Sequence, residues 1–524
     1  MDATNEIWFG AEHPAPGPGC APGPRPIEFA LARLSRPLPV MNNVGLISAL
    51  AAAAHVLIIA GLSVRVIMKR RPPGVSLAWL ILVAFLPYAG AVLYLLFGER
   101  PLGRSRSARA LKMRDSALLW LDRLVRSEAA ATDVPAPWQP IRRLADGAVG
   151  LPALGNNGLT LLTDSEEILR AMIADIGAAQ RFCLMEFYIW NPGGIADEVA
   201  EALMAAARRG VQCRVLLDAV GSAPFWKSSW PRRMGDAGVE VRRALPVGLV
   251  RAAFRRADLR LHRKCVVVDA RIGYTGSLNL VDPRYFKQDS GVGQWVDAMA
   301  RIEGPAVSAL EGLFLWDWAM ETGESVSAAA EGLTAPSRRA DGHAVVQLAP
   351  SGPGYERQGV VQLLRAAVYA AQEELVLTTP YFVPDEPLVA ALVAAAQRGV
   401  RVRLIVPERV DSLLVRHASR SFFQDLLEAG IEILLFQGGL LHTKSIVADR
   451  ELAFFGTLNL DIRSFLLNFE MTLIVYDRGF ASRLAELQSR YAEASRPLSL
   501  AEWERRPALQ RFVENSVQLM SPLL

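Results

Sequence analysis

The sequence predicts an α/β fold made of two copies of one α/β/α sandwich that share a single active site, preceded by a two-helix transmembrane hairpin. Three observations predict it. Two stretches near the amino terminus are long and apolar enough to cross a bilayer. From about residue 158 onward, helical and strand-like stretches alternate, which is typical of an α/β domain. A short motif, LHRKCVVVD at residues 261–269, returns as LHTKSIVAD at residues 441–449.

Length and charge limit the classes of protein to which the chain can belong. Its 524 residues exceed the roughly 250 to 300 residues at which a single core stops growing, so more than one domain is expected. With 57 basic and 53 acidic residues the net charge is +4. A protein that coats nucleic acid would carry a strong basic excess. We therefore expect no nucleic-acid partner, and any preference for anions must be local.

The amino-terminal end combines a tail that cannot bury a core with two apolar stretches. Residues 1–40 are so rich in proline and glycine that we expect a disordered tail. Residues 44–63 and 76–98 each contain about the ~20 apolar residues that a helix needs to cross the bilayer core. Residues 41–98 are therefore predicted to form a transmembrane hairpin.

Basic residues beside the two predicted spans indicate the orientation. The turn between the spans holds four of them, and the stretch after the second span holds six, namely Arg100, Arg104, Arg106, Arg109, Lys112 and Arg114. Because basic loops stay on the cytoplasmic side, the larger cluster predicts that the carboxy-terminal bulk and the amino terminus are both cytoplasmic. Residues 99–157 are predicted to be a basic juxtamembrane linker.

The rest of the chain contains an internal duplication. The helix and strand pattern of residues 165–220 returns after residue 359, and RRGVQCRVLLD at 208–218 matches QRGVRVRLIVP at 397–407 almost position for position. We expect a first copy at residues 158–330 and a second at 331–524. The small, polar stretch 322–345 is predicted to join them.

The duplicated motif can hold an anion. A histidine and a lysine two residues apart in a strand project from the same face, so His262 with Lys264, and His442 with Lys444, can point at one ligand. The apolar residues that follow suit the interior of a sheet, and each run ends in an aspartate, Asp269 or Asp449.

A short polar loop follows each motif. These loops, TGSLNL at 275–280 and GTLNL at 456–460, contribute the candidate donors Ser277, Asn279, Thr457 and Asn459. From motif histidine to loop asparagine the spacing is 17 residues in both copies. We therefore expect one shared site between the copies, with two histidines, two lysines and two asparagines around one anion.

This set of residues suits phosphoryl transfer without a metal. One imidazole attacks phosphorus, the other protonates the leaving oxygen, and the lysines neutralise charge. Each histidine needs a carboxylate on its other ring nitrogen. We expect Glu470 to serve His442 within the second copy, and Asp297 to serve His262 within the first. Neither the four cysteines nor the dispersed carboxylates have metal-ligand spacing, so no metal or other cofactor is expected.

HRKCVVVD with GSLN, and HTKSIVAD with GTLN, resemble the paired HxKxxxxD motifs of the phospholipase D superfamily. With VDPRYFKQDSGVGQWVD at 281–297 and the apolar hairpin, they resemble the bacterial cardiolipin synthases within it. The resemblance implies two phospholipase D-like repeats in the bacterial inner membrane that join two phosphatidylglycerols into cardiolipin and release glycerol. It also implies that His262, Lys264, Asp269, His442, Lys444 and Asp449 are catalytic, with His262 as the nucleophile and His442 as acid and base.

Other functions stay open at this point. The same fold could transfer the phosphatidyl group to water, as a phospholipase D does, or use another donor such as phosphatidylethanolamine. A nuclease fits less well with apolar spans and balanced charge, and a noncatalytic lipid-binding scaffold would not need two intact motifs. Three stretches are candidates for membrane contact, with a solvated face or ordinary packing as the alternative: residues 116–127, 247–264 and 508–524.

Overall fold

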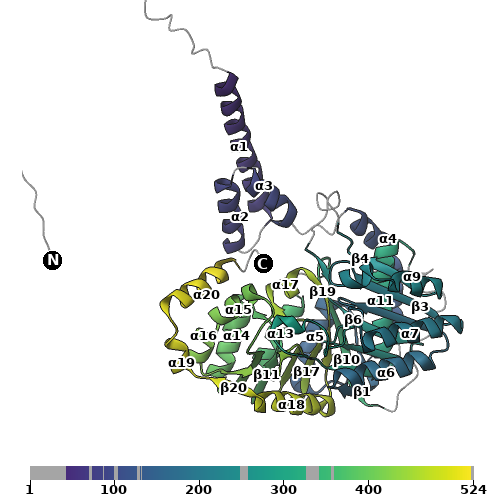
Figure 1. The fold of residues 1–524 in the computed structure, drawn as a ribbon. Coiled ribbons are helices and arrows are strands. Elements are labelled where there is room, and N and C mark those ends of the chain that lie inside the picture. The colour runs from purple at the N-terminus through teal and green to yellow at the C-terminus, as the bar shows by residue number, and fades with distance from the viewer. Residues whose placement is uncertain are drawn as a thin grey trace, which may run out of the picture. The chain divides into compact units, whose positions relative to one another are not determined.

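The computed structural model describes residues 43–69, 73–86, 88–98, 104–126, 130, 133–247, 258–325, 342–355 and 359–520 (Figure 1). The chain separates into two compact units, Met1–Gly61 and Leu62–Leu524. The predicted tail, most of the basic stretch 247–264 and most of the join 322–345 lie outside the described residues.

Helix α1 (Asn43–Met68) agrees with the first predicted span. Its residues Gly45–Met68 are long and apolar enough to cross a membrane. In the described part of the chain it is the single helix that meets this test.

The second predicted span is not one helix. Its residues form α2 (Pro73–Phe85), α3 (Ala89–Leu93) and the π-helical turn η1 (Tyr94–Gly98). The chain folds back tightly here, because a Cβ on Gly90 would lie 2.3 Å from the Leu82 carbonyl oxygen. In the sequence Pro87 separates α2 from α3, and proline has no N–H with which to continue a helix.

The predicted juxtamembrane linker is largely helical and docks on the body that follows. It contains α4 (Arg104–Val125), η2 (Ala136–Trp138) and α5 (Gln139–Val149). Arg109 in α4 donates to the carbonyl oxygens of Met320 at 2.7 Å and Glu321 at 3.0 Å. Trp138 and neighbouring apolar residues of α5 belong to the core of the second repeat. The first repeat begins at Ala153 rather than at residue 158, since β1 already starts there.

The first repeat contains these elements in order: β1 (Ala153–Leu162), α6 (Ser165–Ala178), β2 (Phe182–Phe187), α7 (Ile195–Arg208), β3 (Gln212–Asp218), α8 (Ala223–Lys227), α9 (Trp230–Asp236), β4 (Glu240–Ala244), β5 (Arg260–Leu261), β6 (Lys264–Val268), β7 (Ile272–Gly276), η3 (Gln288–Ser290), β8 (Trp295–Val296), β9 (Met299–Glu303) and α11 (Ala306–Thr322).

The second repeat follows the same plan and adds elements at its end: β10 (Ala344–Ser351), α13 (Gly359–Ala370), β11 (Glu374–Thr378), β12 (Phe382–Val383), α14 (Glu386–Gln397), β13 (Arg401–Pro407), α15 (Leu413–Ser421), α16 (Phe423–Glu428), β14 (Glu432–Phe436), β15 (Leu440–Leu441), β16 (Ser445–Ala448), β17 (Leu452–Gly456), β18 (Leu460–Asp461), α17 (Ile462–Leu466), β19 (Asn468–Val475), α18 (Arg478–Glu493), β20 (Ser495–Leu498), α19 (Leu500–Glu504) and α20 (Ala508–Met520).

The two repeats form one continuous sheet, in which β1 and β10 pair antiparallel at the centre. Outward from this pair, the first half runs β9-β7-β6-β2-β3-β4 and the second runs β19-β17-β16-β11-β13-β14, so the strand order confirms the predicted duplication (Figure 1). In each half, a parallel group of three strands lies beside the antiparallel motif strands.

Helices cover both faces of this sheet because the motif strands are apolar on both sides. In β6, Cys265 and Val267 pack into the cluster that contains α11 and α18, whereas Val266 and Val268 pack into the cluster that contains α6 and α7. In β16, Ile446 and Ala448 face the corresponding cluster with α13 and α14. Because the α11 and α18 cluster draws on both repeats, it joins the two halves into one core.

Candidate active site

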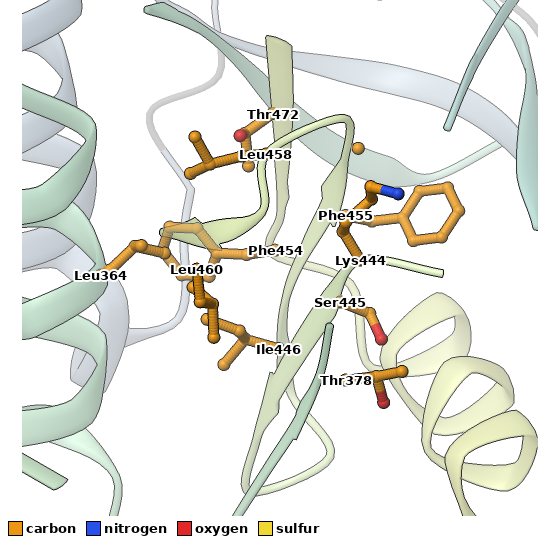
Figure 2. A pocket seen from close by; sticks show the side chains of 11 residues that line it. Leu364, Thr378, Lys444, Ser445, Ile446, Phe454, Phe455, Leu458, Leu460 and Thr472 are labelled. Atoms are coloured by element: carbon orange, nitrogen blue, oxygen red, sulfur yellow. The ribbon is translucent and has the colours of Figure 1, made fainter. Parts of the chain in front are cut away.

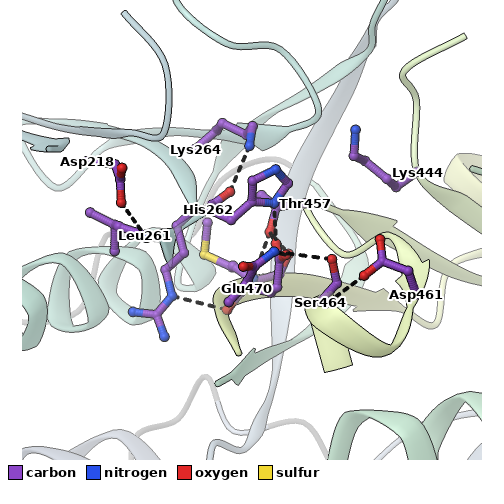
Figure 3. A network of polar contacts seen from close by, with 12 residues as sticks. Asp218, Leu261, His262, Lys264, Lys444, Thr457, Asp461, Ser464 and Glu470 are labelled. Atoms are coloured by element: carbon purple, nitrogen blue, oxygen red, sulfur yellow. Dashed lines mark hydrogen bonds and ion pairs between the residues drawn. The ribbon is translucent and has the colours of Figure 1, made fainter. Parts of the chain in front are cut away.

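The two histidine–lysine pairs meet in one buried site. Lys264 begins β6 and Lys444 directly precedes β16, with the histidine of each pair two residues earlier. Each of the four residues is 7% exposed or less. The Nζ atom of Lys264 donates to the backbone oxygen of His262 at 2.8 Å, and Lys444 makes the equivalent bond to His442 at 2.5 Å. Figure 3 shows Lys264 and Lys444 on either side of the His262 ring. A site that one anion shares between them stays a prediction.

Each histidine pairs with a carboxylate from the other repeat. The Nδ1 atom of His262 lies 2.8 Å from Glu470 Oε2 (Figure 3), and that of His442 lies 2.7 Å from Asp297 Oδ1. The choice of Glu470 and Asp297 as partners agrees with the structure. The predicted assignment within each copy is wrong, because the pairs cross between the copies.

Two short inter-repeat strand pairs cause the crossing. Strand β5 pairs parallel with the start of β19, which sets Leu261 opposite Phe469 and brings the next residues, His262 and Glu470, together. Strand β15 pairs parallel with β8 in the same way, so that His442 follows Leu441 towards Asp297. Backbone bonds fix both registers. The His262 N–H donates to the Phe469 oxygen at 2.9 Å, and the His442 N–H donates to the Val296 oxygen at 2.8 Å.

The hydroxyls of Ser277 and Thr457 bind the carboxylates. Ser277 Oγ donates to Asp297 Oδ1 at 2.6 Å, and Thr457 Oγ1 donates to Glu470 Oε2 at 2.6 Å. These are the same oxygens that contact the histidines. Each hydroxyl therefore orients a carboxylate within its own repeat, and its predicted contact with substrate stays a prediction.

Each of the two loop asparagines has one side-chain amide atom without a hydrogen-bond partner among the described residues. Asn279 accepts from the Ile189 N–H at 3.2 Å, while its buried Nδ2 has no hydrogen-bond partner in the described part of the chain. The buried Oδ1 of Asn459 likewise has no partner among the described residues. Because buried amide groups are rarely left unpaired, the Nδ2 atom of Asn279 is a candidate donor to the anion. The unpaired atom of Asn459 is an acceptor, so Asn459 remains a candidate by its motif position alone.

The motif aspartates lie at the opposite ends of their strands from the lysines. Asp269 follows β6, and its carboxylate accepts the backbone N–H groups of residues 180–182 at 2.8 to 2.9 Å. Asp449 does the same for residues 372–374. Both have positive φ angles of 53° and 51°. This placement corrects the prediction that they are catalytic, because each one anchors the start of the neighbouring strand, β2 or β11.

The site favours neutral histidines before an anion binds. Burial disfavours the charged ring and lowers the pKa of His262 to about 4, although Glu470 opposes the change. Burial and the neighbouring Lys444 lower the pKa of His442 to about 4. Burial also lowers the pKa of Lys264 to about 8 and that of Lys444 well below its usual value.

The carboxylates stay ionised in this environment. Burial alone would raise the pKa of Glu470, but the nearby His262 and Lys264 outweigh burial and lower it. The pKa of Asp297 is lowered in the same way, by His442 and Lys444 against burial. An ionised partner accepts the Nδ1 proton of each ring, which leaves Nε2 as the basic and nucleophilic atom.

Aromatic rings form walls beside both histidines. The Tyr188 ring lies 5.0 Å from that of His262, and the Trp295 ring lies 4.4 Å from that of His442. The sequence interpretation missed both residues, although Trp295 lies two residues before the candidate Asp297 in QWVD. Such walls exclude water and strengthen electrostatic interactions inside the site.

The sequence interpretation also missed Arg263, which stabilises the backbone beside the His262–Glu470 pair. It is fully buried, forms an ion pair with Asp317 in α11, and donates from Nε to the Glu470 carbonyl oxygen at 3.1 Å. Its guanidinium lies 5.8 Å from the Phe469 ring, and Arg106 in α4 lies 5.3 Å from the same ring. A charged residue inside a motif, between histidine and lysine, was the available signal.

A small pocket is lined by residues of the second motif strand, β16, and of the neighbouring strand β17 (Figure 2). Apart from Lys444 its lining contains no charged residue, and most of its apolar side chains belong to the second-repeat core. The Oγ1 atoms of Thr378 and Thr472 in its wall have no partner among the described residues. No group of three or more histidine, cysteine, aspartate or glutamate side chains in the described ranges could hold a metal ion.

Known protein families match both repeats and the apolar amino-terminal segment of this chain. A family model described as cardiolipin synthase, PLD-like domain, matches residues 172–318 and 364–491, and one described as phospholipase D-nuclease N-terminal matches residues 56–99. Cardiolipin synthase A of Serratia proteamaculans (strain 568) is 48% identical over 470 residues, which is 89% of this chain and 96% of the relative. Cardiolipin synthase A of Escherichia coli (strain K12 / DH10B) is 46% identical over 481 residues, or 91% of this chain and 99% of the relative.

A solved structure supports the fold alone. Phosphatidylserine synthase of Haemophilus influenzae Rd KW20 superposes with a TM-score of 0.55 at 15% identity and covers 73% of this chain and 100% of that chain.

Proposed function

Because the chain belongs to the bacterial cardiolipin synthases of the phospholipase D superfamily, we propose that it joins two phosphatidylglycerols into cardiolipin through a covalent phosphohistidine on His262. The chain is a phosphatidyltransferase and a membrane-associated protein. One observation carries the mechanism. Each of two histidines that share a site with two lysines has its Nδ1 atom on a carboxylate.

In the first step, Nε2 of His262 attacks the phosphorus of one phosphatidylglycerol. The new P–N bond replaces the bond from phosphorus to the glycerol oxygen, and protonated His442 gives its proton to that oxygen as glycerol leaves. Lys264 and Lys444 neutralise the nonbridging oxygens. The incoming phosphodiester is an anion, and we expect it to raise the pKa of His442 enough for protonation.

In the second step, neutral His442 takes the proton from a hydroxyl of the second phosphatidylglycerol. The hydroxyl oxygen attacks phosphorus, the P–N bond breaks, and His262 returns to its neutral form. Glu470 stabilises the charge on His262 while the intermediate exists, and Asp297 does so for His442 whenever it is protonated. Asn279 is the proposed loop contact to the phosphodiester, through its unpaired Nδ2 donor, and Asn459 is proposed from its equivalent position in the second motif loop.

Membrane topology belongs to the same proposal. The apolar residues 44–63 and 76–98 and the six basic residues after them support a multi-pass protein whose catalytic unit is cytoplasmic. The substrate is a phospholipid, and phosphatidylglycerol is the proposed donor and acceptor. Water as the acceptor, which yields phosphatidic acid, and phosphatidylethanolamine as the donor are the competing reactions.

Mass spectrometry of lipids tests the reaction. Purified full-length protein in detergent micelles receives phosphatidylglycerol without added metal or nucleotide, with His262→Ala as the control. We expect cardiolipin and glycerol from the wild type and neither from the variant. Phosphatidic acid alone would identify a hydrolase. Product that persists in His262→Ala would contradict the proposed nucleophile.

A further inference from the structure

The helix pair α15 and α20 carries an exposed apolar surface. Figure 1 shows α20 alongside α15, and the two helices contact each other directly. Large apolar side chains at 509, 512, 513 and 519 follow helical spacing along one face of α20. Together with two residues of α15 they form what we name the α15–α20 patch, which consists of Leu413, Leu414, Leu509, Phe512, Val513 and Leu519. Phe512 is 69% exposed and Leu519 is 79% exposed.

The charges of the two helices favour an anionic partner. Arg416 and Arg511 are exposed beside the patch. The single carboxylate within these helices, Glu514, is completely buried, and it binds Arg420 at 2.7 Å and also forms an ion pair with Arg506. The outward charge of this surface is therefore basic. A large apolar patch with basic neighbours is typical of a helix that lies at the interface of an anionic bilayer.

The patch is mechanically linked to the active site. Helix α15 packs on β12, where the Phe382 N–H donates to Ser419 Oγ. Strand β12 pairs with β18, which directly follows Asn459 of the second motif loop. Just before α15, Asp411 accepts from Tyr381 at 2.7 Å and from Lys287 of the first repeat at 3.2 Å. A surface held by α15 therefore keeps a defined position relative to the residues that bind substrate.

We propose that the α15–α20 patch inserts into the surface of an anionic bilayer and holds the active site against the membrane that contains its substrate. The inference rests on the proposed function in one respect, that the substrate is a lipid. It extends that function, because it assigns a membrane contact to the catalytic unit itself, in addition to the apolar amino-terminal helix.

Lipid quenching of a probe on the patch tests this contact. Full-length protein with Cys20→Ser and Phe512→Cys carries an environment-sensitive fluorophore at 512, since the other cysteines are buried. It is placed, one copy per disc, in nanodiscs of phosphatidylcholine and phosphatidylglycerol with brominated acyl chains. The matched control is Glu486→Cys, because Glu486 is exposed on α18, which packs on the opposite face of the sheet.

We expect brominated lipid to quench the probe at 512 and not the probe at 486. An unquenched probe at 512 would overturn the proposal. The proposal would also be overturned if the probe at 512 were shielded from its surroundings only in discs that hold two enzyme copies. That result would identify the patch as a contact between copies. The quenching result does not depend on whether the product is cardiolipin or phosphatidic acid, so it fails or succeeds independently of the proposed function.

Kinetics provide a second test. Phe512→Ser with Leu519→Ser should raise the phosphatidylglycerol mole fraction needed for half-maximal rate on bilayers by about fivefold to tenfold, because two apolar anchors are lost. Activity on short-chain, dispersed phosphatidylglycerol should not change. Equal loss on both substrates would indicate a folding defect and would contradict a role in docking.

Discussion

Glu470 and Asp297 act on histidines that lie 208 and 145 positions away in the sequence. The pairing distinguishes the two imidazoles chemically. Replacing Glu470 should impair His262, the proposed nucleophile. Replacing Asp297 should impair His442, the proposed acid and base.

A substrate with an activated leaving group separates these effects. On phosphatidyl-p-nitrophenol the departure of the leaving group needs no acid, so Asp297→Asn should still release a burst of nitrophenol and then stall at phosphatidyl-His262. Glu470→Gln should show no burst. Both should lose about 10³- to 10⁴-fold in kcat on phosphatidylglycerol, by analogy with other histidine–carboxylate pairs. Stopped-flow absorbance measures the burst, and the reverse pattern would support pairing within each repeat.

The lowered histidine pKa values predict acid sensitivity. Unfolded histidine titrates near pKa 6.5, whereas the folded pKa values of His262 and His442 are about 4. Between these values the unfolded state binds more protons, so stability falls as the pH falls, by about 1.4 kcal/mol per pH unit for each histidine. Thermal unfolding between pH 7 and pH 4.5 measures the slope. The neutral pair His262→Gln/Glu470→Gln should reduce the slope by about half, because His442 still titrates, and an unchanged slope in that variant would contradict the assignment.

At the scale of the element, the motif aspartates hold strands together. Asp269→Ala removes the acceptor of three N–H groups and leaves alanine at a φ of 53°. We expect a loss of about 2–4 kcal/mol in the free energy of unfolding, and a smaller loss for Asp269→Asn, which tolerates this backbone. The folded fraction of Asp269→Asn should retain most of its kcat. A variant that unfolds like wild type but is as inactive as His262→Ala would show a catalytic role.

Helix α4 is held to the body by a buried arginine. Arg106 forms an ion pair with Glu321 at the end of α11, and both side chains are less than a tenth exposed. Arg106→Gln should destabilise the fold by about 3–5 kcal/mol, because it leaves a buried carboxylate unpaired. Hydrogen exchange should show faster exchange in α4 and around Phe469. Lys112→Gln, an exposed change in the same helix, is the control, and equal effects of the two variants would contradict this anchor.

At the scale of the whole molecule, one glycine controls the contact between repeats that forms the His442 site. A Cβ on Gly439 would lie 2.2 Å from the Gln294 carbonyl oxygen beside β8. Gly439→Ala should separate β15 from β8 and reduce kcat at least as much as Asp297→Asn. Gly193→Ala controls for backbone strain, because its φ of 124° matches the 122° of Gly439 and nothing lies within 4 Å of its added methyl group. Steady-state rates of the two variants distinguish the clash at Gly439 from backbone strain. Similar rates for Gly439→Ala and Gly193→Ala would exclude the inter-repeat clash as the cause.

Much of this architecture is visible in the sequence because it is local. The first apolar helix, the duplicated strand order and the histidine–lysine pairs follow from hydrophobic length and from the period-two alternation of strands. The carboxylates Glu470 and Asp297 could also be identified, since each imidazole needs an ionised partner. The break within residues 76–98 was missed, because hydropathy does not report where a helix turns back.

The sequence by itself determined the two histidine–lysine pairs of the site, because a repeated motif preserves residue types and their spacing. Only the tertiary structure decided which carboxylate serves which histidine. That choice depends on β5 joining β19 and β15 joining β8 across the two repeats, and backbone pairing between distant segments has no signature in local spacing. The same holds for Ser277, Thr457 and the motif aspartates, whose hydrogen-bond partners become visible only when separate strands lie side by side.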